Sequence, residues 1–165
     1  MDFVIRKDAR DWFRDIKADF VALPGTISAS DFDAFYFCFM AGVTAKPARK
    51  KDVPATDTAQ LVENFPGPYR NRGRLLVALF LSRELDYLGV SMTEKKSVHA
   101  AISRLVQPEA ANYLSDAGVR EFNKYAHGGY EVLLEWFDDR PRSLETFLRI
   151  FKRKVDAGGE GAPSS

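Results

Sequence analysis

The chain has 165 residues, of which 45% are hydrophobic and 13% aromatic, enough to bury the core of one globular domain. Its 24 basic and 23 acidic residues leave a formal net charge of +1, so no field of the whole molecule draws it onto a polyanion. Binding to nucleic acid would therefore depend on local clusters of charge. A single cysteine, Cys38, excludes an internal disulfide and a cysteine-based zinc site, and favours the reducing cytoplasm.

We expect the N-terminus to carry no targeting signal. The first fifteen residues have scattered charges and no continuous apolar core, unlike a signal peptide. The longest apolar stretch, residues 34–43, is about half of the ~20 residues that span a bilayer. We therefore expect a cytoplasmic protein with no membrane span. Composition predicts one helical domain over residues 1–156 and a disordered tail over residues 157–165.

The first predicted elements are two helices. Over residues 7–22 apolar side chains recur at helical spacing, and the Leu-Pro-Gly sequence at 23–25 ends this amphipathic helix. Ser30, with Asp33 three residues on, predicts the N-cap of the next helix. That helix is rich in phenylalanine and apolar on nearly all sides, so we expect it to be the most buried element.

A long connection follows over residues 44–69, with four prolines. Connections of this length in a compact domain are usually functional or mobile, although a short helix at residues 58–64 is an alternative. Residues 72–88 then predict a strong helix that Gly89 ends. Ser91 and Glu94 predict a capping box for a helix over residues 93–106.

The remaining sequence also predicts helices. One covers residues 116–127 and ends at a Gly-Gly pair, after which residues 130–137 form either a separate helix or its continuation beyond a bend. Ser143 caps a last helix to about residue 155. Neither hairpin turns nor sustained period-two alternation is present. The predicted fold class is all-α, a single compact bundle of six or seven helices with a long, basic, proline-containing connection.

Two basic blocks are candidate phosphate contacts. Arg49, Lys50 and Lys51 belong to the long connection, where mobile, unpaired cations could neutralise phosphates, or serve only to keep the loop soluble. In the second block arginines stand where the helix 72–88 begins, which is unfavourable for the helix dipole unless an anion is also bound there. The alternative is pairing with acids such as Glu63. The arginines are Arg70, Arg72 and Arg74.

A third basic block is explained by structure alone. It closes the last helix, where cations complement the helix dipole, and it comprises Arg149, Lys152, Arg153 and Lys154. An alternative role for the carboxylates is to bind a divalent metal for phosphodiester cleavage, but none recurs with a recognised ligand spacing. The candidates are Asp31, Asp33, Glu63, Glu84 and Asp86, of which Glu84 is expected to pair with Arg83 or with a neighbouring turn.

Other chemistry has weak support. His127 precedes the Gly-Gly pair, where a cationic ring favours the last carbonyls of a helix, and Cys38 is expected to be too buried for a nucleophile. Phosphate-binding glycine motifs and the RNP, zinc-finger and basic-zipper signatures are absent. A helix-turn-helix over residues 74–106 is a further hypothesis, because Gly89 falls in the turn between two predicted helices.

Three segments carry a family resemblance: DAFYFCFMAGVTAKPARKKD, NFPGPYRNRGRLLVALFLSRE and LSDAGVREFNKYAHGGYEVLLEWF. In overall cadence over about residues 31–151, the chain resembles the small helical proteins encoded in DNA phosphorothioation gene islands, of the SspB-type nicking-subunit family. The resemblance implies antiviral defence, DNA as ligand, nicking of one strand with Mg²⁺ or Mn²⁺, and partners among the pathway's desulfurase, ATPase and ATP-pyrophosphatase subunits. It implies no catalytic position.

The leading hypothesis is therefore a DNA-binding component of such a system that nicks DNA. The first alternative is a non-catalytic adaptor that docks its aromatic-rich helix onto a larger ATPase or modification enzyme. The second is a sequence-specific, dimeric regulator.

Overall fold

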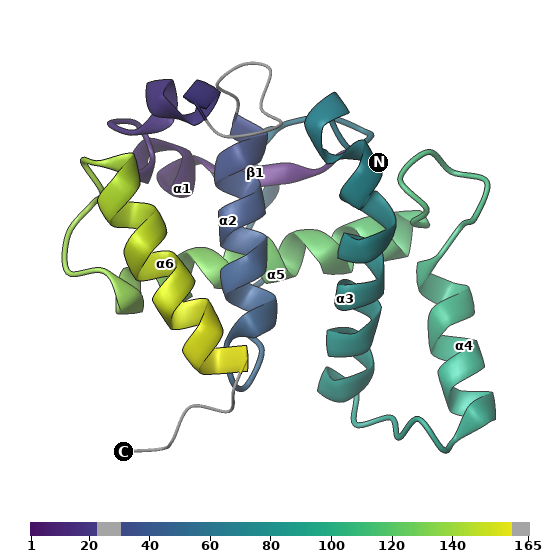
Figure 1. Cartoon of the computed structure of the whole chain (residues 1–165). Coiled ribbons are helices and arrows are strands. Elements are labelled where there is room, and N and C mark those ends of the chain that lie inside the picture. The colour runs from purple at the N-terminus through teal and green to yellow at the C-terminus, as the bar shows by residue number, and fades with distance from the viewer. Residues whose placement is uncertain (23–30, 160–165) are drawn as a thin grey trace.

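The computed structural model describes residues 1–22 and 31–159, and this part of the chain is predominantly helical, which confirms the all-α prediction. It contains six α-helices, three short 3₁₀ helices (η) and two short strands (Figure 1). In chain order these are β1 Val4–Arg6, α1 Lys7–Trp12, η1 Lys17–Ala22, α2 Asp31–Thr44, η2 Ala55–Asp57, β2 Thr58–Gln60, η3 Gly67–Arg72, α3 Gly73–Tyr87, α4 Lys95–Leu105, α5 Asp116–Trp136 and α6 Leu144–Gly159.

Helices α2 and α5 cross at the centre of the molecule with their backbones in contact (Figure 1). A Cβ atom added to Gly129 would lie 1.6 Å from the carbonyl oxygen of Cys38, and one added to Gly42 would lie 2.1 Å from that of Tyr125. The Gly-Gly pair therefore permits close helix packing and does not end the helix. Of the two sequence predictions, the continuation to residue 137 is confirmed almost to the residue, because α5 runs on to Trp136.

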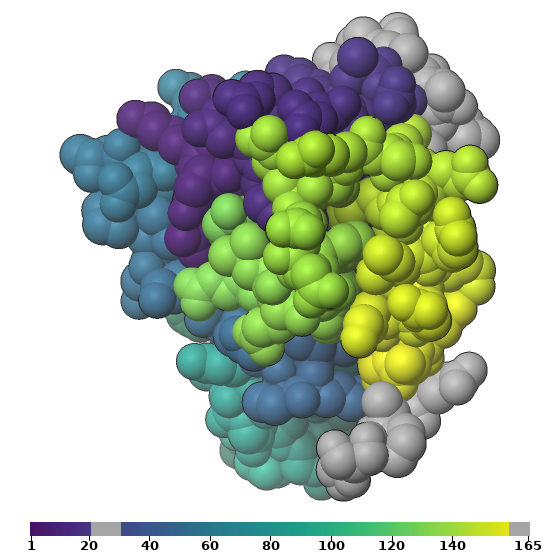
Figure 2. Space-filling model, turned by 90° about the vertical axis from the view of Figure 1, so that its left-hand side faces the viewer, coloured from purple at the N-terminus to yellow at the C-terminus, as the bar shows by residue number. Residues whose placement is uncertain are grey.

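The phenylalanines fill the core around this crossing. Phe39 and Phe122 stack face to face at 4.0 Å between α2 and α5. A second group, Trp12, Phe13, Phe37 and Phe147, joins the N-terminal segment to α2 and α6. As predicted, α2 is buried on nearly all sides. Figure 2 shows the N-terminal segment, α6 and the end of α5 together on one face.

The predicted single helix over residues 7–22 is wrong. Helix α1 stops at Trp12, and the chain continues through i to i+3 hydrogen bonds from Arg14 to Asp11 and from Ile16 to Phe13 into η1. These tighter turns bring Phe13, Ile16 and Phe20 into the core. The predicted Leu-Pro-Gly break at 23–25 and the Ser30 cap lie outside the described residues.

A small antiparallel sheet pairs β1 with β2, with Ile5 opposite Ala59. The short helix considered at residues 58–64 is therefore wrong, and β2 occupies the first part of this segment. Strands of three residues are too short to show a period-two pattern, and β1 pairs with a segment more than fifty residues away.

The later helices match the sequence closely, apart from their ends. The strong helix is α3, and Gly89 follows it with φ +72°. The capping box before α4 is wrong, since the Ser91 hydroxyl accepts from the Thr93 N–H and α4 begins at Lys95. The Ser143 hydroxyl accepts from the Thr146 N–H, as a cap should.

Helix α6 continues to Gly159, so residues 157–159 are helical and do not belong to the predicted disordered tail; residues 160–165 are not described. In the described part of the chain, no helix combines the length and the apolar character needed to cross a bilayer.

Candidate nucleic-acid interface

The first basic block is held against the protein. The connection after α2 is fixed by backbone hydrogen bonds from the Arg49 N–H to the carbonyl of Gly42 (2.9 Å) and from the Lys51 N–H to that of Lys124 (3.0 Å). Lys50 is almost buried, and its ammonium group lies 2.8 Å from Glu84 and 2.5 Å from Glu121. We predicted that this block would be mobile, but backbone hydrogen bonds and ion pairs hold its residues against α2, α3 and α5.

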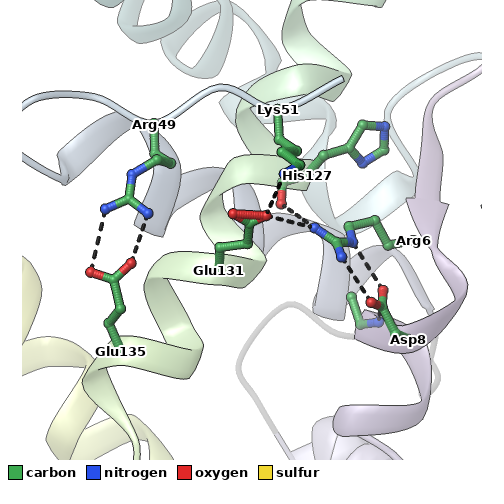
Figure 3. Close-up of polar contacts among 8 residues, drawn as sticks. Arg6, Asp8, Arg49, Lys51, His127, Glu131 and Glu135 are labelled. Carbon is green, nitrogen blue, oxygen red and sulfur yellow. Dashed lines mark hydrogen bonds and ion pairs between the residues drawn. The ribbon is translucent and has the colours of Figure 1, made fainter. Parts of the chain in front are cut away.

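The flanking cations are also paired, as Figure 3 shows. Arg49 donates to both carboxylate oxygens of Glu135, at 2.7 and 3.3 Å. Lys51 lies 3.5 Å from Glu131, which also pairs with Arg6 at 3.3 Å. The hydrogen bond to Glu135 raises the pKa of Arg49. The expectation that this block offers unpaired cations is wrong.

The second block is arranged differently, and we call Arg70, Arg72 and Arg74 the arginine trio. All three side chains are exposed, at the end of η3 and the first turn of α3. None of them forms an ion pair with an acid of the described residues. Glu63, the acid considered as a partner, lies near the N-terminal amine at 4.0 Å. The alternative of pairing with the protein's own acids, such as Glu63, therefore does not apply to the arginine trio within the described residues. The three cations remain available to an external anion.

Two buried residues next to the arginine trio, Tyr69 and Gly73, fix its orientation. The Tyr69 hydroxyl donates to the buried Asp33 of α2. Burial, followed by this hydrogen bond, raises the pKa of Tyr69. Phe65 packs so tightly on Gly73 that a Cβ there would meet its ring at 2.9 Å. Because Tyr69 and Gly73 face the core, the neighbouring arginines project into solvent.

Sequence reasoning missed an aromatic neighbour of the trio. The Arg74 guanidinium lies over the ring of Tyr113, 5.4 Å from its centre. Tyr113 adopts φ +63°, a left-handed conformation that is rare for a bulky residue. The Tyr113 carbonyl accepts from the Gln107 N–H, and the Asn112 amide donates to the Glu63 carbonyl near η3. No feature of the sequence signals this contact, because it joins two turns distant in the chain.

The candidate metal ligands lie apart, each with a partner of its own. Asp31 pairs with Lys17, Asp33 with Tyr69, Glu63 with the N-terminal amine, Glu84 with Lys50 and Asp86 with Arg83. Of the two kinds of partner considered for Glu84, Arg83 is wrong, because Arg83 pairs with Asp86 and Glu84 pairs with Lys50. Within residues 1–22 and 31–159, no three His, Cys, Asp or Glu side chains could hold a metal ion together. The five candidates therefore do not come together as a site of three or more such ligands in this part of the chain.

The remaining candidates also change. Cys38 is buried, and burial raises the pKa of its thiol, which is unsuitable for a nucleophile. The prediction for His127 is wrong, since it lies within α5, and burial lowers its pKa to about 4, so that its ring is neutral. Helices α3 and α4 run side by side in opposite directions, joined by residues 88–94, unlike the short, angled turn of a helix-turn-helix (Figure 1).

The third block is exposed on α6, where Arg149 faces Glu145 at 4.0 Å and Lys152 pairs with Asp156 at 2.6 Å. In the described part of the chain, the first basic block is thus neutralised by ion pairs with the protein's own carboxylates, whereas the arginine trio forms none.

Comparisons of this chain with protein-family models, with curated proteins and with solved structures found no match.

Proposed function

We propose that this chain is a DNA-binding component of a bacterial defence system linked to DNA phosphorothioation, and that the arginine trio contacts backbone phosphates. The observation that supports this most strongly is the exposure of three guanidinium groups between residues 70 and 74, without an ion pair to a described acid. Such groups can donate two N–H bonds each to phosphate oxygens without first giving up a carboxylate. Arg49 and Lys50, in contrast, would have to leave carboxylate partners.

Tyr113 adds to this proposal. A tyrosine beside a phosphate-binding arginine can stack on an unpaired base, and such stacking tolerates any sequence. The pathway, its other subunits as partners and metal-dependent nicking come from the family resemblance. We assign no residue to cleavage.

The test uses supercoiled plasmid, with and without Mg²⁺ or Mn²⁺, and follows both its electrophoretic shift and its conversion to open circles. We expect the wild-type protein to shift the plasmid and Arg70→Gln/Arg72→Gln/Arg74→Gln to lose the shift. The matched control, Arg149→Gln/Lys152→Gln/Arg153→Gln, removes the same charge from exposed positions of α6 and should retain it. Conversion that a chelator blocks would extend the proposal to nicking. An unaltered shift with the trio variant contradicts it.

A second candidate, the non-catalytic adaptor, has an observation of its own. The aromatic-rich helix α2 is largely buried in the core, so it does not offer the docking surface that the sequence suggested for the adaptor. Large apolar side chains are nevertheless exposed along α3 and the turn after it, with Leu75 and Met92 each 70% exposed and Tyr87 57%. Leu75→Ser should then abolish assembly with a partner subunit and leave DNA binding intact. Stable assembly by a wild-type protein that shifts no plasmid would favour the adaptor.

A further inference from the structure

A pocket of about 350 Å³ lies between β1, the segment that leads into β2, and α5. Val4, Val53 and Ala55 contribute mainly apolar walls, and His127 of α5 lines the interior. Arg120, one turn of α5 away from Lys124, lies at its edge and is exposed. We call this the His127 pocket. It is distinct from the surface of the arginine trio.

The imidazole of His127 is buried without a hydrogen-bond partner among the residues that the structure describes. Its side chain is only 4% exposed, and Nδ1 is inaccessible to water and without a hydrogen bond to any described residue. The residue's backbone carbonyl accepts from Arg6 at 3.3 Å, while the ring points away from Arg6 and Glu131 (Figure 3). More than about nine in ten buried polar groups in proteins are paired. An unpaired imidazole that lines a pocket therefore points to a partner supplied by a ligand.

The other polar groups of the pocket are already used. The Asn123 side chain accepts from the Val4 N–H and donates to the Asp2 carbonyl, both at 3.2 Å. Lys124 pairs with Asp52 at 3.2 Å, and the Asp2 carboxylate accepts from Gln60. Two groups are left without a hydrogen bond or an ion pair to any described residue. One is the His127 ring inside, and the other is the Arg120 guanidinium at the edge.

These two groups define the chemistry of a ligand. Burial, followed by the charge of Arg6, lowers the pKa of His127 to about 4, whereas Asp8 and Asp52 oppose the effect. Because Nδ1 is sealed, a ligand in the pocket reaches the ring only at its other nitrogen, which is a donor in one tautomer and an acceptor in the other. The edges of nucleobases carry both donors and acceptors, so either tautomer can be matched. Apolar walls suit a flat ring, and Arg120 suits an anionic group. The volume is close to the lower end of ligand pockets, about 300 to 1,000 Å³, which suits one nucleotide.

We propose that the His127 pocket binds a single nucleotide, with its base beside His127 and Val53 and its phosphate toward Arg120. A free mononucleotide and an unstacked nucleotide of a single strand share this chemistry. The inference does not depend on the arginine trio, so the two proposals can fail separately.

Nuclear magnetic resonance of ¹⁵N-labelled histidine rings tests this inference, because the chain has two histidines. His99 is exposed on α4 and serves as the internal control. We expect each of the four deoxynucleoside monophosphates, or a short single strand, to shift the His127 signals and leave those of His99 in place. Inorganic phosphate and a strand of abasic residues should shift neither. A response to monophosphates identifies the free nucleotide as a ligand, and a response to the strand alone identifies the nucleotide of a chain.

Two variants separate binding from folding. Ala55→Trp, at an exposed position of η2, should fill the pocket mouth and abolish the shift without changing the helical circular dichroism. Arg120→Gln should weaken binding about tenfold, which is the effect of losing one charged hydrogen bond. His127 signals that remain unmoved with every ligand, or that move equally with the abasic strand, overturn the proposal.

Discussion

The ammonium nitrogen of Lys50 lies 2.8 Å from Oε1 of Glu84, and the two side chains are almost sealed from water, with 9% and 1% of their surfaces exposed. Glu121 reaches the same ammonium group, and the Tyr125 hydroxyl donates to Glu84 at 2.9 Å. Burial alone would raise the pKa of Glu121, but Lys50 and Lys124 lower it. These groups join the connection after α2 to α3 and α5.

Replacing Lys50 with methionine should destabilise the protein strongly. The substitution keeps most of the apolar stem but leaves Glu84 buried without its cation, which typically costs about 3 to 5 kcal/mol. Urea denaturation followed by circular dichroism measures this change in the free energy of unfolding.

The matched control is the adjacent lysine. Lys51 is half-exposed and lies 3.5 Å from Glu131, so Lys51→Met should cost less than about 1 kcal/mol. Equal losses at the two positions would contradict the structural role assigned to Lys50.

Gly129→Ala should disrupt the crossing of α2 and α5. The added Cβ would lie 1.6 Å from the Cys38 carbonyl oxygen, and backbone cannot move aside as a side chain can. We expect the thermal midpoint to fall with a loss of about 3 kcal/mol or more. At Gly89 a Cβ meets nothing, and the positive φ alone predicts about 1 kcal/mol for Gly89→Ala. A Gly129 variant as stable as the Gly89 variant is the result that this packing does not allow.

His127 should make stability depend on pH. Its pKa falls from 6.5 in the unfolded chain to about 4 in the folded one, so the unfolded state binds more protons between these values. The contribution is complete above pH 6.5 and decreases as pH falls toward 4, by about 3 kcal/mol in total. Urea denaturation at pH 7.5 and pH 4.5 should show a wild-type loss about 2 kcal/mol larger than that of His127→Phe.

His99→Phe is the control for this measurement, because His99 is exposed to water on α4. It should keep the wild-type dependence on pH. If His127→Phe loses as much stability on acidification as the wild type, the buried, neutral state of His127 is refuted.

The helices could be predicted because their signals are local. Helix α3 follows from apolar residues at helical spacing and from the stop at Gly89, and α2 follows from a run of apolar residues too long for a surface helix. The small sheet could not be predicted, because it pairs residues that are far apart in the sequence, such as Ile5 and Ala59. The role of the Gly-Gly pair could not be predicted either. These glycines allow α5 to pack closely on the backbone of α2, and residues near them in the sequence do not indicate this contact.

The candidate site was predicted only in part, for a related reason. Glycine, proline and arginine are visible in a sequence, but an ion pair is a fact about two distant positions. Arg49 meets a carboxylate 86 residues away and Lys50 one 34 residues away, so neither could be recognised as neutralised. Tyr113 beside Arg74 and the unpaired ring of His127 depend on the same long-range arrangement.

DNA binding by the arginine trio is tested most directly by the salt dependence of affinity. Fluorescence anisotropy of a labelled duplex, measured from low to moderate salt, gives the slope of log K against log salt for the wild type and for Arg70→Gln/Arg72→Gln/Arg74→Gln. Each phosphate contact contributes about 0.9 to this slope, so we expect the variant's slope to be shallower by about 2 to 3. The α6 control variant should keep the wild-type slope. An identical slope for the wild type and the trio variant would contradict the proposed contact.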